Sequence, residues 1–237
     1  WIRGGTHMQL EQFLQLLLRN GYAVASLNYR LVPEGVFPAP IHDVKAAVRY
    51  LRAHAHELGI NPERIGVAGE SAGAHLAQLL AVSADQPSLE GDLGNAAFSS
   101  RVKAAVSYYG IADVRRLAGE RIDQGCKNPW VYDPNKPNEA EYGLLGGGNL
   151  DTLERQQRAL LASPIHYVDA GDPPMLLLHG RQDCVVAFVQ SQNMHDALQK
   201  AGVPSQLRLI DADHAEAKFY ADPQLQRLLL DFLRTYL

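Results

Sequence analysis

Two spacings of hydrophobic residues alternate along most of the chain. Apolar residues recur with helical spacing in five segments, near residues 10–18, 41–55, 72–84, 187–201 and 225–232. Short apolar runs typical of buried strands lie between them: YAVASLN, RIGVAG, VKAAVSYYG, PPMLLLHG and SQLRLID. Apolar strands that alternate with amphipathic helices predict an α/β fold, with a mostly parallel sheet of these five strands covered by helices on both faces.

One long stretch interrupts this alternation. From Asp113 to about Leu161 the sequence is rich in Gly, Asn, Pro and charged residues. Long segments of this kind inside a compact domain are usually functional or disordered. We expect a single domain over residues 1–237, in which 113–161 is a cap-like insertion or pocket wall over the strand ends, helical near LERQQRALL. The GGGN run at Gly146 lacks the context of a phosphate-binding loop and is expected to be a turn.

Composition narrows the class of protein. The 237 residues are 46% hydrophobic and 20% charged with a net charge of -4, as in ordinary globular enzymes and binding proteins. No basic cluster indicates nucleic-acid binding, and the apolar runs are far shorter than the roughly 20 residues of a membrane span. Cys126 and Cys184 have no metal-site spacing; one bridge or two free thiols are both possible, and we favour free thiols. Oligomeric state and cellular location are not predicted.

The segment GESAG contains the first candidate for chemistry. Ser71 follows the strand RIGVAG and precedes a helix, the context of a G-x-S-x-G nucleophile elbow. We expect a strained turn in which Gly69 and Gly73 avoid clashes where strand and helix cross. The helix N-terminus directs N–H groups toward a developing oxyanion, so Ala72 N–H is the expected first donor of an oxyanion hole.

A serine hydroxyl needs a base and the base needs a carboxylate, and both should lie at the same sheet edge. Among nine histidines, His214 directly follows the strand SQLRLID. Asp183 follows PPMLLLHG, whereas Asp172 precedes that strand and would lie at the opposite edge. Asp211 and Asp213 are too near His214 in sequence to approach its ring easily. Two other histidines are expected to be buried or hydrogen-bonded locally, His75 and His179.

The chain order Ser71, Asp183, His214 is that of the α/β-hydrolases. The sequence resembles bacterial carboxylesterases of the hormone-sensitive-lipase-like and feruloyl-esterase-like groups over most of residues 20–235. The matching segments are NYRLVPEGVFPAPIHDVKAAVRYLR, RIGVAGESAGAHLA, ASPIHYV, PPMLLLHGRQDCVV and DADH. The resemblance implies hydrolysis of carboxylic esters without a cofactor, with Ser71 as nucleophile, His214 as base and Asp183 as its partner.

The N-terminus departs from the family pattern. Family members have an HGGG-type loop that completes the oxyanion hole, whereas this chain opens with WIRGGTHM and begins with Trp1. Trp1 resembles the aromatic residue that closes an HGGGW motif, so we expect the natural gene product to be longer, with the loop and about three strands ahead of Trp1. A rival alignment makes WIRGG a degenerate copy, with Arg3 in the histidine position.

The same sequence features fit two functions other than ester hydrolysis. A serine peptidase of the same fold, or a ligand-binding relative with impaired catalysis, are the alternatives to an esterase. A dehydrogenase is disfavoured because no strand runs into a G-x-G-x-x-G turn. The expected partner is a small acyl or aromatic ester. Four aromatic residues are candidates for its pocket, although packing of the insertion explains them equally well: Tyr109, Trp130, Tyr132 and Tyr142.

Overall fold

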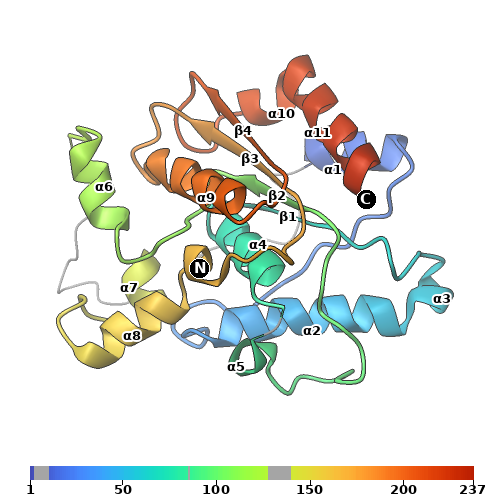
Figure 1. The fold of residues 1–237 in the computed structure, drawn as a ribbon, viewed down its shortest axis with the longest axis horizontal. Helices are drawn as coiled ribbons and strands as arrows, with labels where there is room; N and C mark the ends of the chain where they lie inside the picture. The colour runs from blue at the N-terminus through green and yellow to red at the C-terminus, as the bar shows by residue number, and fades with distance from the viewer. Residues whose placement is uncertain (3–10, 85, 128–139) are drawn as a thin grey trace.

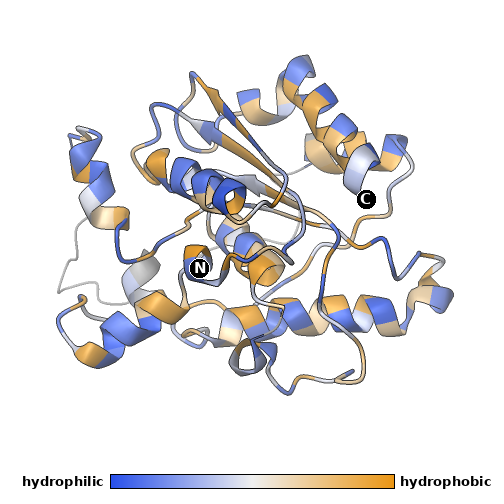
Figure 2. Ribbon diagram, in the orientation of Figure 1, coloured by the Kyte–Doolittle hydropathy of each residue, from blue (hydrophilic) through white to orange (hydrophobic). Residues whose placement is uncertain are grey.

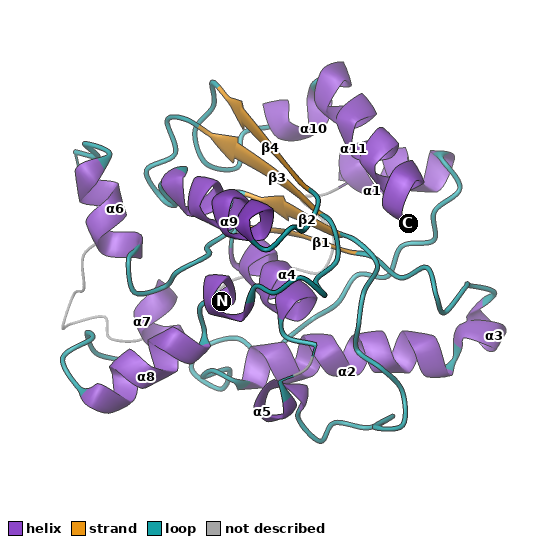
Figure 3. Ribbon diagram, in the orientation of Figure 1, coloured by secondary structure: helices purple, strands orange, loops and turns teal. Residues whose placement is uncertain are grey.

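A four-stranded parallel sheet lies at the centre of the fold (Figures 1 and 3). The computed structural model describes residues 1–2, 11–84, 86–127 and 140–237. The strands are β1 (Val67–Glu70), β2 (Ala105–Tyr108), β3 (Met175–Gly180) and β4 (Ser205–Ile210), in the spatial order β1-β2-β3-β4. Every pair is parallel, so the carboxyl ends of all four strands lie at one edge of the sheet.

Helices connect these strands and cover both faces of the sheet. The α-helices are α1 (Glu11–Arg19), α2 (Ala39–Ala53), α3 (Ala55–Leu58), α4 (Ala72–Val82), α5 (Pro87–Glu90), α6 (Leu117–Asp123), α7 (Ala140–Leu144), α8 (Leu153–Leu161), α9 (Val189–Lys200), α10 (Lys218–Ala221) and α11 (Pro223–Tyr236), and η1 (Pro164–Tyr167) is a 3-10 turn. The five helices expected from apolar spacing correspond to α1, α2, α4, α9 and α11, with ends within a few residues of the prediction.

The sheet separates two hydrophobic cores. Along β3, Met175 and Leu177 pack in the core that includes α2, α4 and α9, whereas Leu176 and Leu178 pack in the core that includes α1, α10 and α11. Successive side chains of a strand point to opposite faces, so a continuous apolar run is expected where both faces are covered. The covering helices carry both hydrophobic and hydrophilic residues, as amphipathic elements do (Figure 2).

The prediction of a fifth strand, at YAVASLN, is wrong. Residues 22–28, YAVASLN, have no regular secondary structure and are mostly exposed, with Val24 at 36%. A strand is stable only when its N–H and C=O groups pair with a neighbour. Within the described part of the chain, β1 pairs with β2 alone, and no strand pairs with residues 22–28. The apolar composition of this segment therefore did not determine its conformation.

Residues 113–161, the segment expected to be an insertion, contain helical segments. The prediction of a helix at LERQQRALL is confirmed by α8, whose N-cap Thr152 accepts a hydrogen bond from Arg155 N–H. The GGGN run is the expected turn, with positive φ at Gly146, Gly147 and Gly148. Trp130 and Tyr132 lie outside the described residues. Nowhere in the described ranges does a helix combine the length and apolar character needed to cross a membrane.

Candidate active site

Ser71 lies in a strained turn between β1 and α4. Its φ of 49° and ψ of -115° are unusual for a residue with a side chain. The backbone of this turn is fixed at both sides, because Ser71 N–H donates to Tyr108 O at 2.9 Å and Ser71 O accepts from His75 N–H at 2.9 Å. The Ser71 side chain does not cap α4. Its hydroxyl is therefore directed to another partner.

The two glycines of the turn have different roles. A Cβ at Gly69 would collide with the backbone carbonyl of Gly73, so the close approach of strand and helix requires glycine at position 69. A Cβ at Gly73 would meet nothing within 4 Å. The expectation that both glycines avoid clashes is thus correct for Gly69 and wrong for Gly73.

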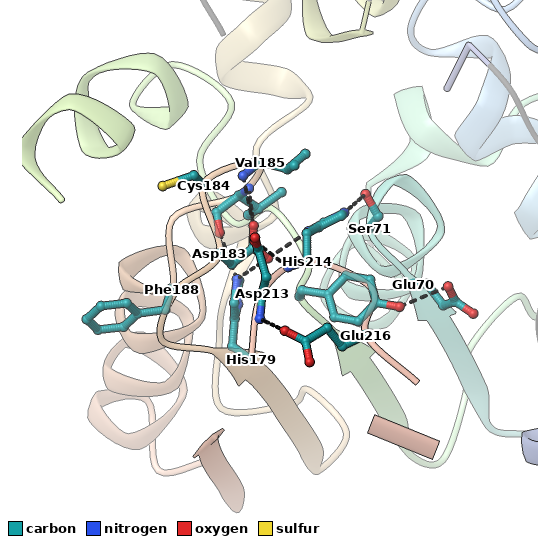
Figure 4. A network of polar contacts seen from close by, with 12 residues as sticks. Glu70, Ser71, His179, Asp183, Cys184, Val185, Phe188, Asp213, His214 and Glu216 are labelled. Atoms are coloured by element: carbon teal, nitrogen blue, oxygen red, sulfur yellow. Dashed lines mark hydrogen bonds and ion pairs between the residues drawn. The ribbon is translucent and has the colours of Figure 1, made fainter. Parts of the chain in front are cut away.

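His214 connects Ser71 to Asp183 (Figure 4). Its Nδ1 lies 2.6 Å from Asp183 Oδ2, and its Nε2 lies 3.0 Å from Ser71 Oγ. An ionised carboxylate can only accept, so the proton resides on Nδ1 and Nε2 is free to accept from the serine hydroxyl. The structure thus brings together all three side chains that the sequence singled out, from the ends of β1, β3 and β4.

Asp183 is fully buried and has several donors. Oδ1 accepts from the N–H groups of Val185 at 2.9 Å and Val186 at 2.8 Å. Oδ2 lies near a second imidazole, with His179 Nε2 at 3.3 Å. Burial raises the pKa of the Asp183 carboxyl, but hydrogen bonds from His179 and His214 outweigh it and lower that pKa to about 2. Asp183 is therefore a carboxylate at neutral pH.

His179 lies behind this carboxylate. It is fully buried, as the sequence predicted. Its Nε2 donates to Val186 O at 2.9 Å, so Nδ1 accepts from the Ser191 hydroxyl at 2.7 Å. The contact of His179 with Asp183 was not predicted, because a strand-terminal histidine four residues before an aspartate does not reveal where the intervening loop turns.

The loop at 181–188, called the acid loop below, is tied to the insertion. Gln124 Nε2 donates to Asp183 O at 2.7 Å, and Gln124 Oε1 accepts from Phe188 N–H at 3.1 Å. Cys126 and Cys184 form a disulfide with their Cα atoms 5.6 Å apart, and no cysteine is free. The expectation of free thiols is wrong, because two cysteines separated by 58 positions are brought together by folding and not by their spacing.

Tyr109 does not wall an open pocket. Its side chain is fully buried, and its ring centroid lies 4.6 Å from that of His214. Its hydroxyl donates to Glu70 Oε2 at 2.9 Å and lies 2.7 Å from the Tyr220 hydroxyl. A positive φ of 44° at the end of β2 turns the ring into this position. The other described pocket candidate, Tyr142, is half-buried in α7.

His75 packs inside the fold, as expected. Trp1 Nε1 donates to its Nδ1 at 3.2 Å, and its Nε2 donates to Ala162 O at 2.6 Å. Burial lowers the pKa of His75 to about 4, so the ring is neutral at physiological pH. The helix that carries His75 thus begins next to Ser71 but receives no charge from His75.

The start of α4 is the candidate oxyanion site. Ala72 is the first residue of the helix, where N–H groups have no partner one turn earlier. The partial positive charge of the helix N-terminus favours an anion there. The rival HGGG-like segment with Arg3 lies outside the described residues.

The sequence of this chain is similar to a known protein family and to known esterases. A family profile described as BD-FAE matches residues 1–198. LipQ, an esterase of Mycobacterium tuberculosis, is 32% identical over 217 residues, which cover 91% of this chain and 48% of LipQ. LipM, a probable carboxylic ester hydrolase of the same organism, is 30% identical over 209 residues, which cover 84% of this chain and 43% of LipM.

A solved structure extends the likeness to the fold. A truncated form of a carbohydrate esterase from gut microbiota is 32% identical, with a TM-score of 0.77 over 93% of this chain and 76% of that one. The chain spans less than half the length of the two curated relatives. With its parallel sheet and the profile match over residues 1–198, the chain belongs to the BD-FAE family and has the α/β-hydrolase fold.

Proposed function

We propose that this protein hydrolyses carboxylic esters by a Ser71–His214–Asp183 triad. The observation that carries the proposal is the continuous hydrogen-bond chain from Ser71 Oγ through His214 to the buried Asp183 carboxylate. A hydroxyl, an imidazole and a carboxylate in this order form a nucleophile, a general base and an orienting group. The esterase names of the relatives support the same activity.

In the first half of the reaction the serine is acylated. His214 Nε2 takes the hydroxyl proton of Ser71 as Oγ attacks the ester carbonyl carbon. Asp183 stabilises the resulting imidazolium, and Ala72 N–H donates to the developing oxyanion. His214 then returns the proton to the leaving alkoxide oxygen. The C–O bond breaks, an alcohol departs and an acyl-Ser71 ester remains.

In the second half, water replaces the alcohol. His214 Nε2 accepts a proton from a water molecule as the water oxygen attacks the acyl carbon. The second tetrahedral intermediate collapses, the bond to Ser71 Oγ breaks and His214 returns the proton to that oxygen. The products are a carboxylic acid and the free serine, so no cofactor is consumed.

The proposed substrates are small acyl or aromatic esters. We propose that the insertion at 113–161 acts as a cap and that its aromatic residues Trp130, Tyr132 and Tyr142 contribute to the substrate pocket. Aromatic side chains commonly line small-molecule sites. The carbohydrate-esterase neighbour makes acylated sugars a further group of esters to include in a substrate panel.

The proposal is tested by steady-state hydrolysis of p-nitrophenyl esters, aromatic esters and acylated sugars. Ser71→Ala should lower kcat/KM by at least about 10⁴-fold, since the covalent route is removed. Ser83→Ala is the matched control, because the Ser83 hydroxyl is buried at the end of α4 without a hydrogen-bond partner among the described residues. Full activity in Ser71→Ala, or faster cleavage of matched amides than of esters, would contradict the proposal.

A further inference from the structure

The carboxylate beside the serine is only partly paired. Glu70 is the last residue of β1, and its Oε2 accepts from the Tyr109 hydroxyl at 2.9 Å. Its Oε1 is buried without a hydrogen-bond partner in the described part of the chain. Carboxylate oxygens in folded proteins are normally paired when they are buried. An unpaired oxygen one residue from the proposed nucleophile therefore calls for a functional explanation.

Tyr109 lies between this carboxylate and His214. Its hydroxyl bonds to Glu70, and its ring meets the imidazole of His214 with centroids 4.6 Å apart and planes at 62°. Tyr220 of α10 adds a second hydroxyl, 2.7 Å from that of Tyr109. Phe219 packs on the Tyr109 ring with centroids 4.9 Å apart. These contacts leave the Tyr109 ring little freedom to move away from His214.

The position of Tyr109 has a backbone cost. A positive φ is uncommon for a bulky side chain, and Tyr109 has a φ of 44°. Its N–H nevertheless donates to Leu178 O at 2.7 Å, so the turn remains bonded to the neighbouring strand β3. Strained residues with this degree of support concentrate at functional sites. The strained backbone at Tyr109 thus places an aromatic ring against the proposed base, His214.

We propose that Glu70 and Tyr109 form a positioning pair for His214: Tyr109 fixes the imidazole plane between Ser71 and Asp183, and Glu70 anchors Tyr109 and favours positive charge on the imidazole. The inference rests on the proposed triad. When Ser71 loses its proton, His214 becomes a cation, which is attracted by a nearby aromatic ring and by a nearby carboxylate. The first carboxylate, Asp183, acts by direct hydrogen bond, and the second acts from the side of the Tyr109 ring.

Several charged or titratable groups face this imidazole. Asp183 lies on the Nδ1 side and Ser71 on the Nε2 side, Tyr109 lies beside the ring, and Glu70 binds the Tyr109 hydroxyl. Asp213 in the same turn accepts from the backbone N–H of His214 at 2.7 Å, and its own N–H donates to Glu216 Oε1. Figure 4 shows Glu70 and Ser71 as neighbours that reach the site from the end of β1. Glu70 makes neither of the two hydrogen bonds that join Ser71, His214 and Asp183, so Glu70→Gln leaves both in place.

The test compares isosteric variants in p-nitrophenyl acetate hydrolysis. Glu70→Gln should lower kcat about tenfold with KM within about twofold, and Tyr109→Phe should lower kcat about threefold, because both weaken support for the base in the transition state. Loss of the Glu70 charge disfavours protonated His214, so the acidic limb of the kcat/KM profile should move to lower pH. Glu70→Asp retains the charge and should return that limb toward the wild-type position.

Tyr167→Phe is the matched control. The Tyr167 hydroxyl donates to Leu161 O at 2.8 Å, so this variant also loses one tyrosine hydrogen bond but lies in η1. It should leave kcat, KM and the pH profile within about twofold of wild type. A wild-type pH profile and kcat in Glu70→Gln would overturn the positioning pair, and so would a raised KM at unchanged kcat, which would indicate substrate binding by Glu70.

A second measurement separates this inference from the proposed function. If the wild-type protein hydrolyses no ester, the proposed function fails while the pair is tested by NMR of the His214 imidazole. Assignment by comparison with His214→Gln allows its protonation to be followed against pH without turnover. In Glu70→Gln, the imidazole should take up its proton at a lower pH than in wild type. An unchanged titration would overturn the proposed effect of Glu70 in the absence of any activity.

Discussion

The two ends of the Ser71–His214–Asp183 chain are fixed in different ways. At the serine end, the backbone determines position through a φ of 49° at Ser71 and a close strand–helix approach at Gly69. At the acid end, an irregular loop is fixed by hydrogen bonds from other segments and by a disulfide. The serine end depends on one strained backbone conformation and on the close approach at Gly69, whereas the acid end depends on several separate contacts.

The largest loss of activity is expected when the carboxylate at the acid end is replaced. Asp183→Asn leaves the shape of the acid loop, but an amide can donate to His214 Nδ1 and so favour the wrong tautomer. A loss of about 10³- to 10⁴-fold in kcat/KM is expected, measured with p-nitrophenyl acetate. Asp172→Asn, in the turn before β3, is the control and should remain within about twofold. Similar rates for the two variants would contradict the role of Asp183.

The serine end is tested by adding one methyl group. Gly69→Ala places a Cβ against the Gly73 carbonyl, so the turn must shift, which should lower unfolding free energy by about 1–3 kcal/mol and kcat by about tenfold or more. Gly73→Ala is the matched control, with nothing within 4 Å of the added Cβ. Thermal unfolding and kcat are the measurements. Equal effects at both positions would show that the close approach at Gly69 does not matter.

The acid end is tested by removing the disulfide. The double variant Cys126→Ser, Cys184→Ser should unfold more easily by about 2–4 kcal/mol, because the bridge restricts the unfolded chain. Because Gln124 still bonds to the acid loop, kcat should fall only a few-fold. Denaturant unfolding and steady-state kinetics measure the two effects. A reductant should destabilise wild type but not the double variant, and a reductant-insensitive wild type would contradict the structure.

A last prediction concerns the pH dependence of stability near the serine end, where wild type and variant differ only in acid. His75, one turn from Ser71, has a pKa lowered by burial to about 4, whereas unfolded histidine titrates near 6.5. As pH falls through this window the unfolded state takes up a proton and the native state does not, so stability is lost. The loss should approach about 3 kcal/mol by pH 4. In His75→Gln, unfolding free energy should fall less steeply between pH 6.5 and 4; an unchanged slope would contradict a neutral buried His75.

Sequence reasoning was most successful where one residue type and its place at a strand end were enough. Ser71, Asp183 and His214 each follow a strand of the parallel sheet, so their convergence follows from topology. It failed where position depended on distant partners. Residues 22–28 have strand-like composition but no pairing neighbour, and the Cys126–Cys184 bridge joins segments whose proximity is created by folding.

The side chains around the proposed triad could not be predicted from the sequence either. Tyr109 at the end of β2 suggested a substrate wall, but its positive φ turns the ring behind His214. Nothing in the pattern around Glu70 revealed that one of its oxygens would be buried without a partner in the described chain. Such features depend on side-chain packing across three strand ends, which spacing along a single chain does not encode.

The central claim is that Ser71 is the nucleophile, and covalent labelling tests it most directly. Wild-type protein incubated with a fluorophosphonate should gain one adduct, and peptide mass spectrometry should place it on Ser71, with loss of ester hydrolysis in proportion to labelling. The adduct should be absent in Ser71→Ala and form far more slowly in His214→Gln. Ester hydrolysis by wild-type protein whose adduct maps to another residue would contradict the claim.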